Sequence, residues 1–353
     1  MNTYYFANQI YQLSYAWPIF NRIGGEFIVR KYKTLLKFKR FLRGSVKSGS
    51  GAFLGTPVVK RRKLRYVSDL TGVVLSQSNA WVRNDTDKSR SIFIGHGTGD
   101  KKYGGKAHTL LNYQYVFVSG PKHMEKFKDS DLIFPESSLV KIGNLRFDDY
   151  VNGKLDKNAI MNRMGVPETD RARKTVLYAP TWEWGNGTLE KYAKPFMKQI
   201  TQEHNLIIRP HHFDSHRVPK LKLWAKLNGI KRVYFSNSNR IAVSDTMHDF
   251  AVSDILISDT SSVLYEYLIT GKPIVIANTD FSGLHNMPDT MNVMKIADFF
   301  RGSEKILDVV NRNLASDTSK YLEMLHNCFY FNDGKSVDRA VEFINGVAGE
   351  LKQ

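Results

Sequence analysis

Residues 253–277 are the stretch that most restricts how this chain can fold. Ile255-Leu256-Ile257 is an apolar run that is too short for a helix and is bounded by polar residues, which indicates a buried strand. Asp259-Thr260-Ser261-Ser262 then supplies four side chains of the type that caps a helix start, and Gly271 is a C-terminal cap signal. The run Pro273-Ile274-Val275-Ile276-Ala277 predicts a second strand. Two strands joined through a helix run parallel, so the stretch predicts a βαβ unit and an α/β fold.

The turn before this predicted helix is suited to bind phosphate. The first N–H groups of a helix have no partner inside the helix, and the helix dipole adds partial positive charge there. Thr260, Ser261 and Ser262 add hydroxyl donors at the same place, and Glu266 lies four residues after Ser262 on the same helix face. A carboxylate at that position can accept hydrogen bonds from a ribose. From spacing alone, a well-capped helix whose single acid faces water is an equally good interpretation.

Length and charge limit the possible classes of function. A chain of 353 residues exceeds one typical hydrophobic core, so two lobes are expected. The net charge is +17, from 51 Lys and Arg against 34 Asp and Glu. This balance favours an anionic partner, which can be nucleic acid, a phospholipid surface or a phosphorylated substrate. Cys328 is the single cysteine, which excludes an internal disulfide and any multi-cysteine metal site.

The first 65 residues are basic and amphipathic. Lysines and arginines are dense from Arg22 to Arg65, aromatic and aliphatic residues are interleaved with them, and Glu26 is the only acid there. We expect residues 1–50 to form a basic amphipathic segment that lies on an anionic membrane. Nucleic-acid binding and a solvated face packed on the rest of the lobe are the alternatives. No run approaches the roughly 20 uninterrupted apolar residues of a membrane-spanning helix. The helical spacing at the start rests on Phe6, Ile10, Leu13, Trp17 and Phe20.

Two series of strand-like runs indicate two Rossmann-like lobes with a cleft between them. A polar, helical stretch at residues 152–169 separates the two series. We therefore expect a first lobe at residues 1–165 and a second lobe at residues 166–353, which ends in a helix from residue 336. The runs of the first series lie at residues 72–76, 91–95 and 115–119, and those of the second at residues 175–179, 205–208, 233–235 and the βαβ unit.

Three loops directly follow predicted strands, where functional side chains of parallel sheets gather. The first is His96-Gly97-Thr98-Gly99-Asp100-Lys101, and a histidine beside glycines and lysines can be a general base near a phosphate. The second is Arg209-Pro210-His211-His212, whose cationic groups can neutralise phosphate oxygens. The third contains Thr181-Trp182, which either lines a pocket or covers the sheet edge. A structural role for a lone histidine is the alternative in the first loop.

These motifs together resemble the CDP-glycerol glycerophosphotransferase family, which includes the teichoic acid primases and polymerases. The similarity rests on HGTGDKK from His96, YAPTWEW from Tyr178, RPHH from Arg209 and ISDTSSVLYEY from Ile257, and it covers about residues 90 to 280. The segment from Ile142 to Asp148 also resembles the family's glycine-x-x-arginine segment. The resemblance implies a two-lobed glycosyltransferase-B fold. It also implies transfer of glycerol phosphate from CDP-glycerol, or ribitol phosphate from CDP-ribitol, to a hydroxyl of a lipid-linked glycan, releasing CMP at the inner face of the membrane.

The resemblance also implies roles for individual residues. His96 would be the general base for the acceptor hydroxyl, and His211 or its neighbour His212 would contact the pyrophosphate. Thr260, Ser261 and Ser262 would hold the donor phosphates, and Glu266 would hold the ribose. The scheme requires no metal and no cofactor. Further substrate-binding residues would be Gly97, Thr98, Lys101, Thr181, Trp182, Arg209 and Asp259.

Two other functions remain as alternatives to the phosphotransferase. A glycosyltransferase of the same fold would move a sugar from a nucleotide-sugar and form a glycosidic bond. A basic module that binds nucleic acid would need only the amino-terminal stretch, but the sequence has no helix-turn-helix, RNA-binding or zinc signature. We therefore expect no nucleic-acid partner and a peripheral enzyme at the cytoplasmic face of the membrane.

Overall fold

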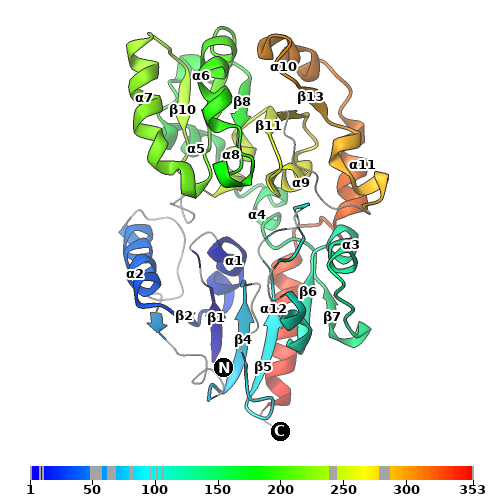
Figure 1. The fold of residues 1–353 in the computed structure, drawn as a ribbon. Coiled ribbons are helices and arrows are strands. Elements are labelled where there is room, and N and C mark those ends of the chain that lie inside the picture. The colour runs from blue at the N-terminus through cyan, green and yellow to red at the C-terminus, as the bar shows by residue number, and fades with distance from the viewer. Residues whose placement is uncertain are drawn as a thin grey trace.

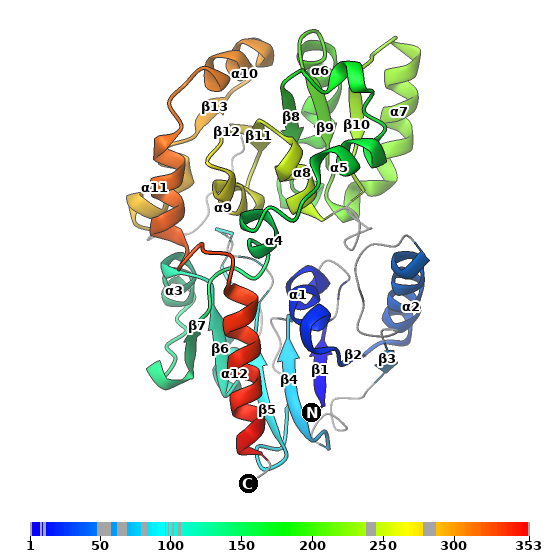
Figure 2. The ribbon, with the colours of Figure 1, turned by 180° about the vertical axis from the view of Figure 1, so that it is seen from behind.

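The protein folds into two α/β lobes, each built on one parallel sheet (Figure 1). The computed structural model describes residues 2–7, 9, 12–47, 58–61, 69–78, 83–95, 97, 99–100, 102–104, 107–237, 245–277 and 287–351. Helices flank both sheets, and the lobes meet where the strands of both sheets end (Figures 1 and 2). This confirms the expected α/β fold with two Rossmann-like lobes.

The sheet of the first lobe has the strand order β3-β2-β1-β4-β5-β6-β7. All of its strand pairs are parallel. Buried side chains occupy both faces of the central strands, as expected for a parallel sheet covered by helices on each side. The strands are β1 (Thr3–Phe6), β2 (Glu26–Val29), β3 (Val58–Arg61), β4 (Gly72–Ser76), β5 (Ser89–Phe93), β6 (Tyr115–Val118) and β7 (Leu139–Lys141).

The sheet of the second lobe has the order β10-β9-β8-β11-β12-β13 and is also entirely parallel. The strand order reverses direction between β8 and β11. In such sheets a crevice opens at that point, beyond the carboxyl ends of the strands, and ligands bind there. The strands are β8 (Thr175–Tyr178), β9 (Asn205–Ile208), β10 (Val233–Phe235), β11 (Ile255–Ser258), β12 (Ile274–Ala277) and β13 (Asp298–Phe300).

The helices complete the layers around the two sheets (Figure 2). In the first lobe they are α1 (Leu13–Ile23), α2 (Tyr32–Lys47) and α3 (Pro121–Asp129). The next two, α4 (Asp148–Val151) and α5 (Lys157–Met164), follow β7 and lead into the second lobe. The remaining helices are α6 (Leu189–Ile200), α7 (Val218–Leu227), α8 (Thr246–Val252), α9 (Val263–Glu266), α10 (Ile306–Leu314), α11 (Ser319–Cys328) and α12 (Ser336–Glu350).

Most of the described residues from Thr3 to Val29 are buried in the first lobe, so the expectation of a surface segment at residues 1–50 is wrong for β1, α1 and β2. Strand β1 lies between β2 and β4, and all four of its side chains are buried. Its sequence of threonine and aromatic residues favours a strand, which interrupts the helical spacing that includes Phe6. Helix α1 begins only at Leu13 and buries Ile19 and Phe20. Residues 31–40, at the start of α2, largely keep the expected basic and exposed character.

The terminal helix α12 packs against the first lobe, although the sequence places it after the second. Ala340 and Ile344 are fully buried in the same cluster as Tyr5 and Leu75 of the first sheet. The spacing of its apolar residues predicted a helix but carried no information on which lobe it covers. The boundary between the lobes at residues 165 and 166 stays a prediction. Helix α12 follows the second lobe in the sequence but returns to the first lobe.

Candidate functional site

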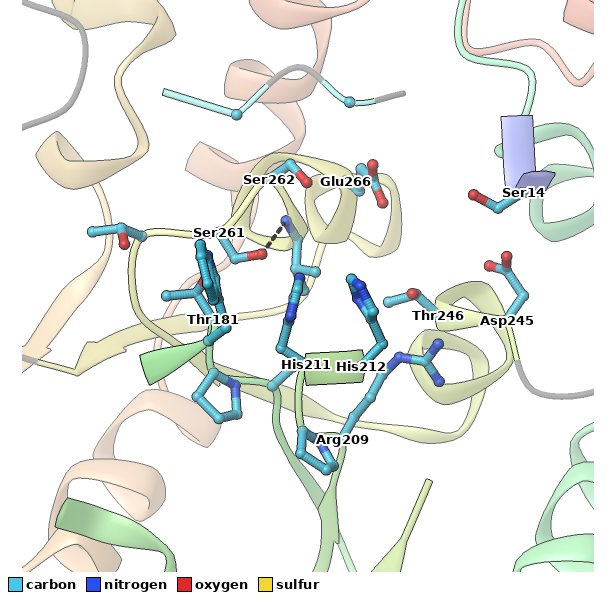
Figure 3. A pocket seen from close by; sticks show the side chains of 18 of the residues that line it. Ser14, Thr181, Arg209, His211, His212, Asp245, Thr246, Ser261, Ser262 and Glu266 are labelled. Atoms are coloured by element: carbon cyan, nitrogen blue, oxygen red, sulfur yellow. Dashed lines mark hydrogen bonds between the residues drawn. The ribbon is translucent and has the colours of Figure 1, made fainter. Parts of the chain in front are cut away.

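A cavity of about 320 Å³ lies between the lobes and is lined by both of them. The second lobe contributes the loops that follow β8, β9 and β11, together with the start of α8. The first lobe contributes α1, α3 and the loop after β5. Figure 3 shows His211 and His212 pointing into this space below Ser261 and Ser262, with Ser14 of α1 opposite Asp245. The three loops that the sequence indicated therefore meet at one site.

The turn after β11 presents hydroxyl groups to the cavity. Thr260, Ser261 and Ser262 all line it, and Ser261 Oγ accepts a hydrogen bond from the Val263 N–H at 3.4 Å. The α-helix that follows is shorter than expected, because α9 ends at Glu266 and continues as a 3₁₀ helix at Tyr267–Thr270. A single α-helical turn has a small dipole, so the hydroxyls and local N–H groups provide most of the polarity at this point.

Asp259 is buried beneath the cavity and does not line it, which corrects its expected role as a substrate ligand. Its carboxylate accepts hydrogen bonds from the Thr181 N–H at 2.8 Å and from the Thr188 N–H and hydroxyl at 3.1 Å. Burial raises the pKa of Asp259 to about 6, and these donors oppose the increase. Asp259 thus fixes the loop after β8 to the turn after β11, and it positions Thr181 at the cavity wall.

Arg209 lines the cavity, but its charge is already compensated by the protein. Its Nη1 lies 2.7 Å from Asp249 Oδ2 and 2.8 Å from Ser236 Oγ. Asp249 is fully buried, and this burial raises the pKa of its carboxyl. The sequence indicated a guanidinium aimed at phosphate. The structure instead places Arg209 in a buried ion pair that supports the base of the loop carrying the two histidines.

Both histidines of that loop face the cavity (Figure 3). His211 Nδ1 accepts a hydrogen bond from the Phe213 N–H at 3.4 Å, so the proton of a neutral His211 imidazole lies on Nε2. The His211 ring also stacks beside Trp182. His212 is half-buried, and burial together with the nearby charge of Lys37 lowers its pKa to about 4. The neutral form of His212 is therefore the form present at pH 7.

The loop after β5 comes directly against the turn after β11. A Cβ added to Gly99 would lie 3.0 Å from the backbone nitrogen of Ser262, and one added to Gly97 would lie 3.3 Å from Ser262 Oγ. Gly97 has a φ of +139°, a conformation that favours glycine. These two glycines therefore let the first lobe approach the hydroxyl-rich turn. His96, Thr98 and Lys101, which the sequence also indicated, lie outside the described residues.

Glu266 lines the cavity, and both of its carboxylate oxygens contact the first lobe. The Tyr15 hydroxyl donates to Oε1 and Arg146 Nη1 donates to Oε2. Arg146 Nη2 lies 2.6 Å from Asp245 Oδ1, so a single guanidinium bridges two carboxylates of the second lobe. These acids keep the pKa of Arg146 well above its usual value, although burial alone would lower it. The predicted ribose ligand is therefore also part of a contact between the lobes.

Sequence reasoning missed several residues of the cavity. Arg146 lies in the segment that resembles the family's glycine-x-x-arginine motif, so the sequence pointed to this residue. No sequence pattern indicated that Arg146 forms ion pairs with Glu266 and Asp245. Residues on α1, α3 and α8 reach the cavity only through the packing of the lobes, and no local pattern marks them. The missed lining residues are Ser14, Tyr15, Lys126, Arg146, Asp245 and Thr246.

Within the described ranges, no group of three or more His, Cys, Asp and Glu side chains lies close enough together to hold a metal ion. In the same part of the chain, no helix combines the length and the apolar character needed to cross a bilayer.

The fold and the site define a class of protein: two parallel α/β lobes that enclose a polar crevice at the carboxyl ends of their strands. The sequence profile described as CDP-Glycerol:Poly(glycerophosphate) glycerophosphotransferase matches residues 55–346. The chain belongs to this family, which confirms the resemblance inferred from the motifs.

Curated relatives share about a quarter of their residues with this chain. The teichoic acid glycerol-phosphate primase of Bacillus subtilis (strain 168) is 26% identical over 221 residues, which is 56% of this chain and 52% of the primase. The teichoic acid ribitol-phosphate primase of Bacillus spizizenii is 25% identical over 276 residues, which is 71% of this chain and 66% of that primase. The chain therefore spans less than two thirds of the length of these relatives.

Solved structures share the fold at lower identity. The wall teichoic acid polymerase TagF superposes with a TM-score of 0.69 at 17% identity, covering 99% of this chain and 90% of the TagF chain. A putative UDP-N-acetylglucosamine 2-epimerase from Listeria monocytogenes superposes with a TM-score of 0.57 at 11% identity, covering 99% and 97% of the two chains.

Proposed function

We propose that this protein transfers glycerol phosphate, or ribitol phosphate, from its CDP-alditol to a hydroxyl of a lipid-linked glycan or polymer and releases CMP. The observation that carries the proposal is the family match over residues 55–346, combined with a crevice that brings the motif loops of both lobes together. Transfer of a phosphoryl group depends mainly on positioning and on neutralisation of charge. The arrangement of the lobes supports a glycosyltransferase-B type division, with the acceptor on the first lobe and the nucleotide on the second.

The second lobe carries the donor in this proposal. Thr260, Ser261 and Ser262 donate hydrogen bonds to the diphosphate. These three residues line the cavity that His211 also faces, and in this proposal His211 Nε2–H donates to the leaving phosphate. Glu266 accepts hydrogen bonds from the ribose, because each carboxylate oxygen retains lone pairs beside its Tyr15 and Arg146 contacts.

The first lobe carries the acceptor in this proposal. His96 follows Gly95 and precedes Gly97, and Gly97 lies against Ser262, so the loop enters the cavity next to the proposed phosphate site. His96 takes the proton of the acceptor hydroxyl as that oxygen attacks the phosphorus, and CMP leaves on the side of His211. The new phosphodiester forms as the phosphoanhydride bond of the donor breaks.

We further propose that the protein binds an anionic membrane through α2 and α7. On α2, Lys33 and Lys39 are exposed together with Tyr32 and Leu36. On α7, Leu227 is 76% exposed, and the helix also exposes Leu223 among lysines. Figures 1 and 2 show both helices on the same side of the molecule, one from each lobe. A surface of exposed apolar and basic side chains beside the crevice would hold the protein where a lipid-linked acceptor reaches it.

The reaction is tested by incubating the purified protein with CDP-glycerol, CDP-ribitol and UDP-N-acetylglucosamine, together with a lipid-linked acceptor, and identifying the released nucleotide by chromatography. We expect CMP from a CDP-alditol, and at least a hundredfold lower rates for His96→Ala and His211→Ala. His216→Ala is the matched control, because His216 lies in the same loop region and is exposed. Release of UDP alone would favour the glycosyltransferase alternative and refute the proposal.

Membrane binding is tested by sedimentation with vesicles that contain about a third anionic lipid. Each basic residue near such a surface contributes about 1 kcal/mol, so Lys33→Glu with Lys39→Glu should weaken binding by about thirtyfold or more. The control is Lys320→Glu with Lys335→Glu, which changes the net charge equally on α11 and at the start of α12 instead of on α2. Equal effects of the two double variants would reject α2 as the contact surface.

A further inference from the structure

Helix α3 carries two buried lysines on the face that it turns toward the second lobe. Lys122 and Lys126 are four residues apart, so they lie on one side of the helix. Lys122 is 0% exposed and Lys126 is 7% exposed. Figures 1 and 2 show α3 at the end of the first lobe that meets the second, beside α11. Lysines are almost never buried in this way unless a partner compensates their charge.

Lys122 has such a partner within the protein. Its Nζ lies 2.5 Å from Asp100 Oδ1 and 3.6 Å from the centre of the Tyr265 ring. The Tyr265 hydroxyl donates to the other oxygen of Asp100 at 3.0 Å. Each carboxylate oxygen of Asp100 therefore already has a partner, Lys122 or Tyr265, and no contact between Asp100 and the Lys126 Nζ is found among the described residues.

Lys126 has no equivalent partner among the described residues. Its Nζ lies 4.6 Å from the centre of the Tyr103 ring, and the Tyr103 hydroxyl is bonded to His123 Nε2 at 2.9 Å. Burial and the charge of Lys122 lower the pKa of Lys126 to about 8, although Asp100 opposes this shift. The side chain also lines the cavity. The titratable groups around this face of α3, from its own helix, the loop after β5, α9 and α11, are Lys122, His123, Asp100, Tyr103, Tyr265 and Cys328.

The other cations of the cavity are compensated by carboxylates. Arg146 pairs with Asp245 and Glu266, and Arg209 pairs with Asp249. Within the described part of the cavity wall, Lys126 is thus the cation whose charge still lacks an anion. A ligand oxygen that carries negative charge would supply the missing counter-ion.

We propose that Lys126 binds a phosphate ester of the substrate on the first-lobe side of the cavity. This inference deepens the proposed phosphotransferase function and rests on it. Two sources of the phosphate share this chemistry: the phosphate that the donor transfers, and a phosphodiester at the end of a poly(alditol phosphate) acceptor. Lys126 then either helps to orient the transferred group or selects acceptors that already end in phosphate.

The first experiment measures how Lys126→Met changes binding and turnover. A charge-assisted hydrogen bond contributes about 1.5–3 kcal/mol, which corresponds to a loss of roughly 10- to 150-fold in affinity or in kcat/KM. Lys128→Met is the matched control, because Lys128 lies on the same helix but is exposed and paired with Glu125. Methionine has a similar length and no charge, so it should be tolerated in this buried position.

Three ligands distinguish the two sources by calorimetry and kinetics. A weaker affinity for CDP-glycerol, with unchanged affinity for CMP and sn-glycerol 3-phosphate, assigns Lys126 to the transferred phosphate. A weaker affinity for sn-glycerol 3-phosphate, with a lower kcat/KM only for acceptors that end in glycerol phosphate, assigns it to the acceptor. If Lys126→Met matches Lys128→Met in all of these measurements, the proposal is wrong.

A second experiment uses the unmodified protein and does not depend on a variant. At pH 8 an amine whose pKa is about 8 is about half protonated, and a bound phosphate raises that pKa. Binding of sn-glycerol 3-phosphate or CDP-glycerol should therefore take up about half a proton, measured by calorimetry in two buffers of different ionisation enthalpy. No uptake with either ligand overturns the inference about Lys126. By contrast, a wild-type protein that releases no CMP from any CDP-alditol overturns the proposed function.

Discussion

Replacing Arg146 by methionine removes the guanidinium that joins the two lobes inside the cavity. In the wild type this group contacts Asp245 at 2.6 Å and Glu266, while Tyr15 donates to the same glutamate. The side chains of Arg146 and Glu266 are 7% and 1% exposed. Arg146→Met therefore leaves the Glu266 charge buried with only one neutral donor, and it leaves Asp245 without its cation.

The expected cost follows from this burial. Removal of one partner from a buried ion pair costs about 3–5 kcal/mol, because the remaining charge stays desolvated. Asp245 is more exposed than Glu266, so its share of the loss is smaller. For lobes of this size each kcal/mol lowers the melting temperature by about 2–4 °C, which gives a decrease of roughly 6–20 °C.

The assay is urea unfolding of Arg146→Met, followed by tryptophan fluorescence and circular dichroism. The control is Arg312→Met, because Arg312 pairs with Asp298 and Glu304 at the surface and should lose no more than about 1 kcal/mol. The double variant Arg146→Met with Glu266→Gln should regain part of the loss, since no buried carboxylate is then left without a cation at that position. If Arg146→Met loses no more stability than Arg312→Met, the pair does not stabilise the fold as argued.

Three further predictions concern single residues near the cavity. Asp259→Asn removes the charged acceptor of the Thr188 hydroxyl and of two N–H groups, so the free energy of unfolding should fall by about 2–4 kcal/mol. An unchanged denaturation midpoint would contradict this role of Asp259. Gly99→Ala adds a Cβ 3.0 Å from Ser262 atoms and should separate the two loops, so kcat/KM for CMP release should fall by at least about tenfold. Wild-type kinetics of this variant would show that the contact is not needed. The pKa of His212 is about 4 in the folded protein and about 6.5 in the unfolded chain. Because the unfolded chain binds the proton at a higher pH, the stability of the fold should decrease as the pH falls from 6.5 to 4. His212→Gln should reduce this dependence in unfolding curves measured across that range, and an identical pH profile would contradict the assignment.

The sequence carried enough information for the strands and loops of the site because their signals are local. Residues 205–208 and 233–235 were predicted as strands and match β9 and β10, and the run at residues 91–95 is shifted by two residues from β5. Parallel strands place their carboxyl ends on one edge, so loops found separately in the sequence could be placed together before the structure was known. The same rule predicted that Thr181, His211 and Ser261 share one crevice.

Properties that depend on contacts distant in sequence could not be predicted in the same way. Tyr15 and Glu266 are 251 residues apart, and Arg146 and Glu266 are 120 residues apart. Nothing near Glu266 distinguishes a ribose ligand from a partner of an arginine in the other lobe. The return of α12 to the first lobe has the same origin, because helical spacing identifies the apolar face and not the surface that covers it.

In the proposed function, the position of Glu266 would link substrate binding to the contact between the lobes. Its carboxylate lies in α9, directly after the turn that presents Thr260, Ser261 and Ser262, and its partners Tyr15 and Arg146 belong to the first lobe. In the proposed function, a ribose that donates to Glu266 would use the same carboxylate that contacts the first lobe. Interactions through one charged group polarise each other in a buried site, so the strength of the proposed ribose contact would depend on how closely the lobes approach. If the proposed ribose contact forms, the same buried carboxylate would bind the donor and take part in the contact between the lobes.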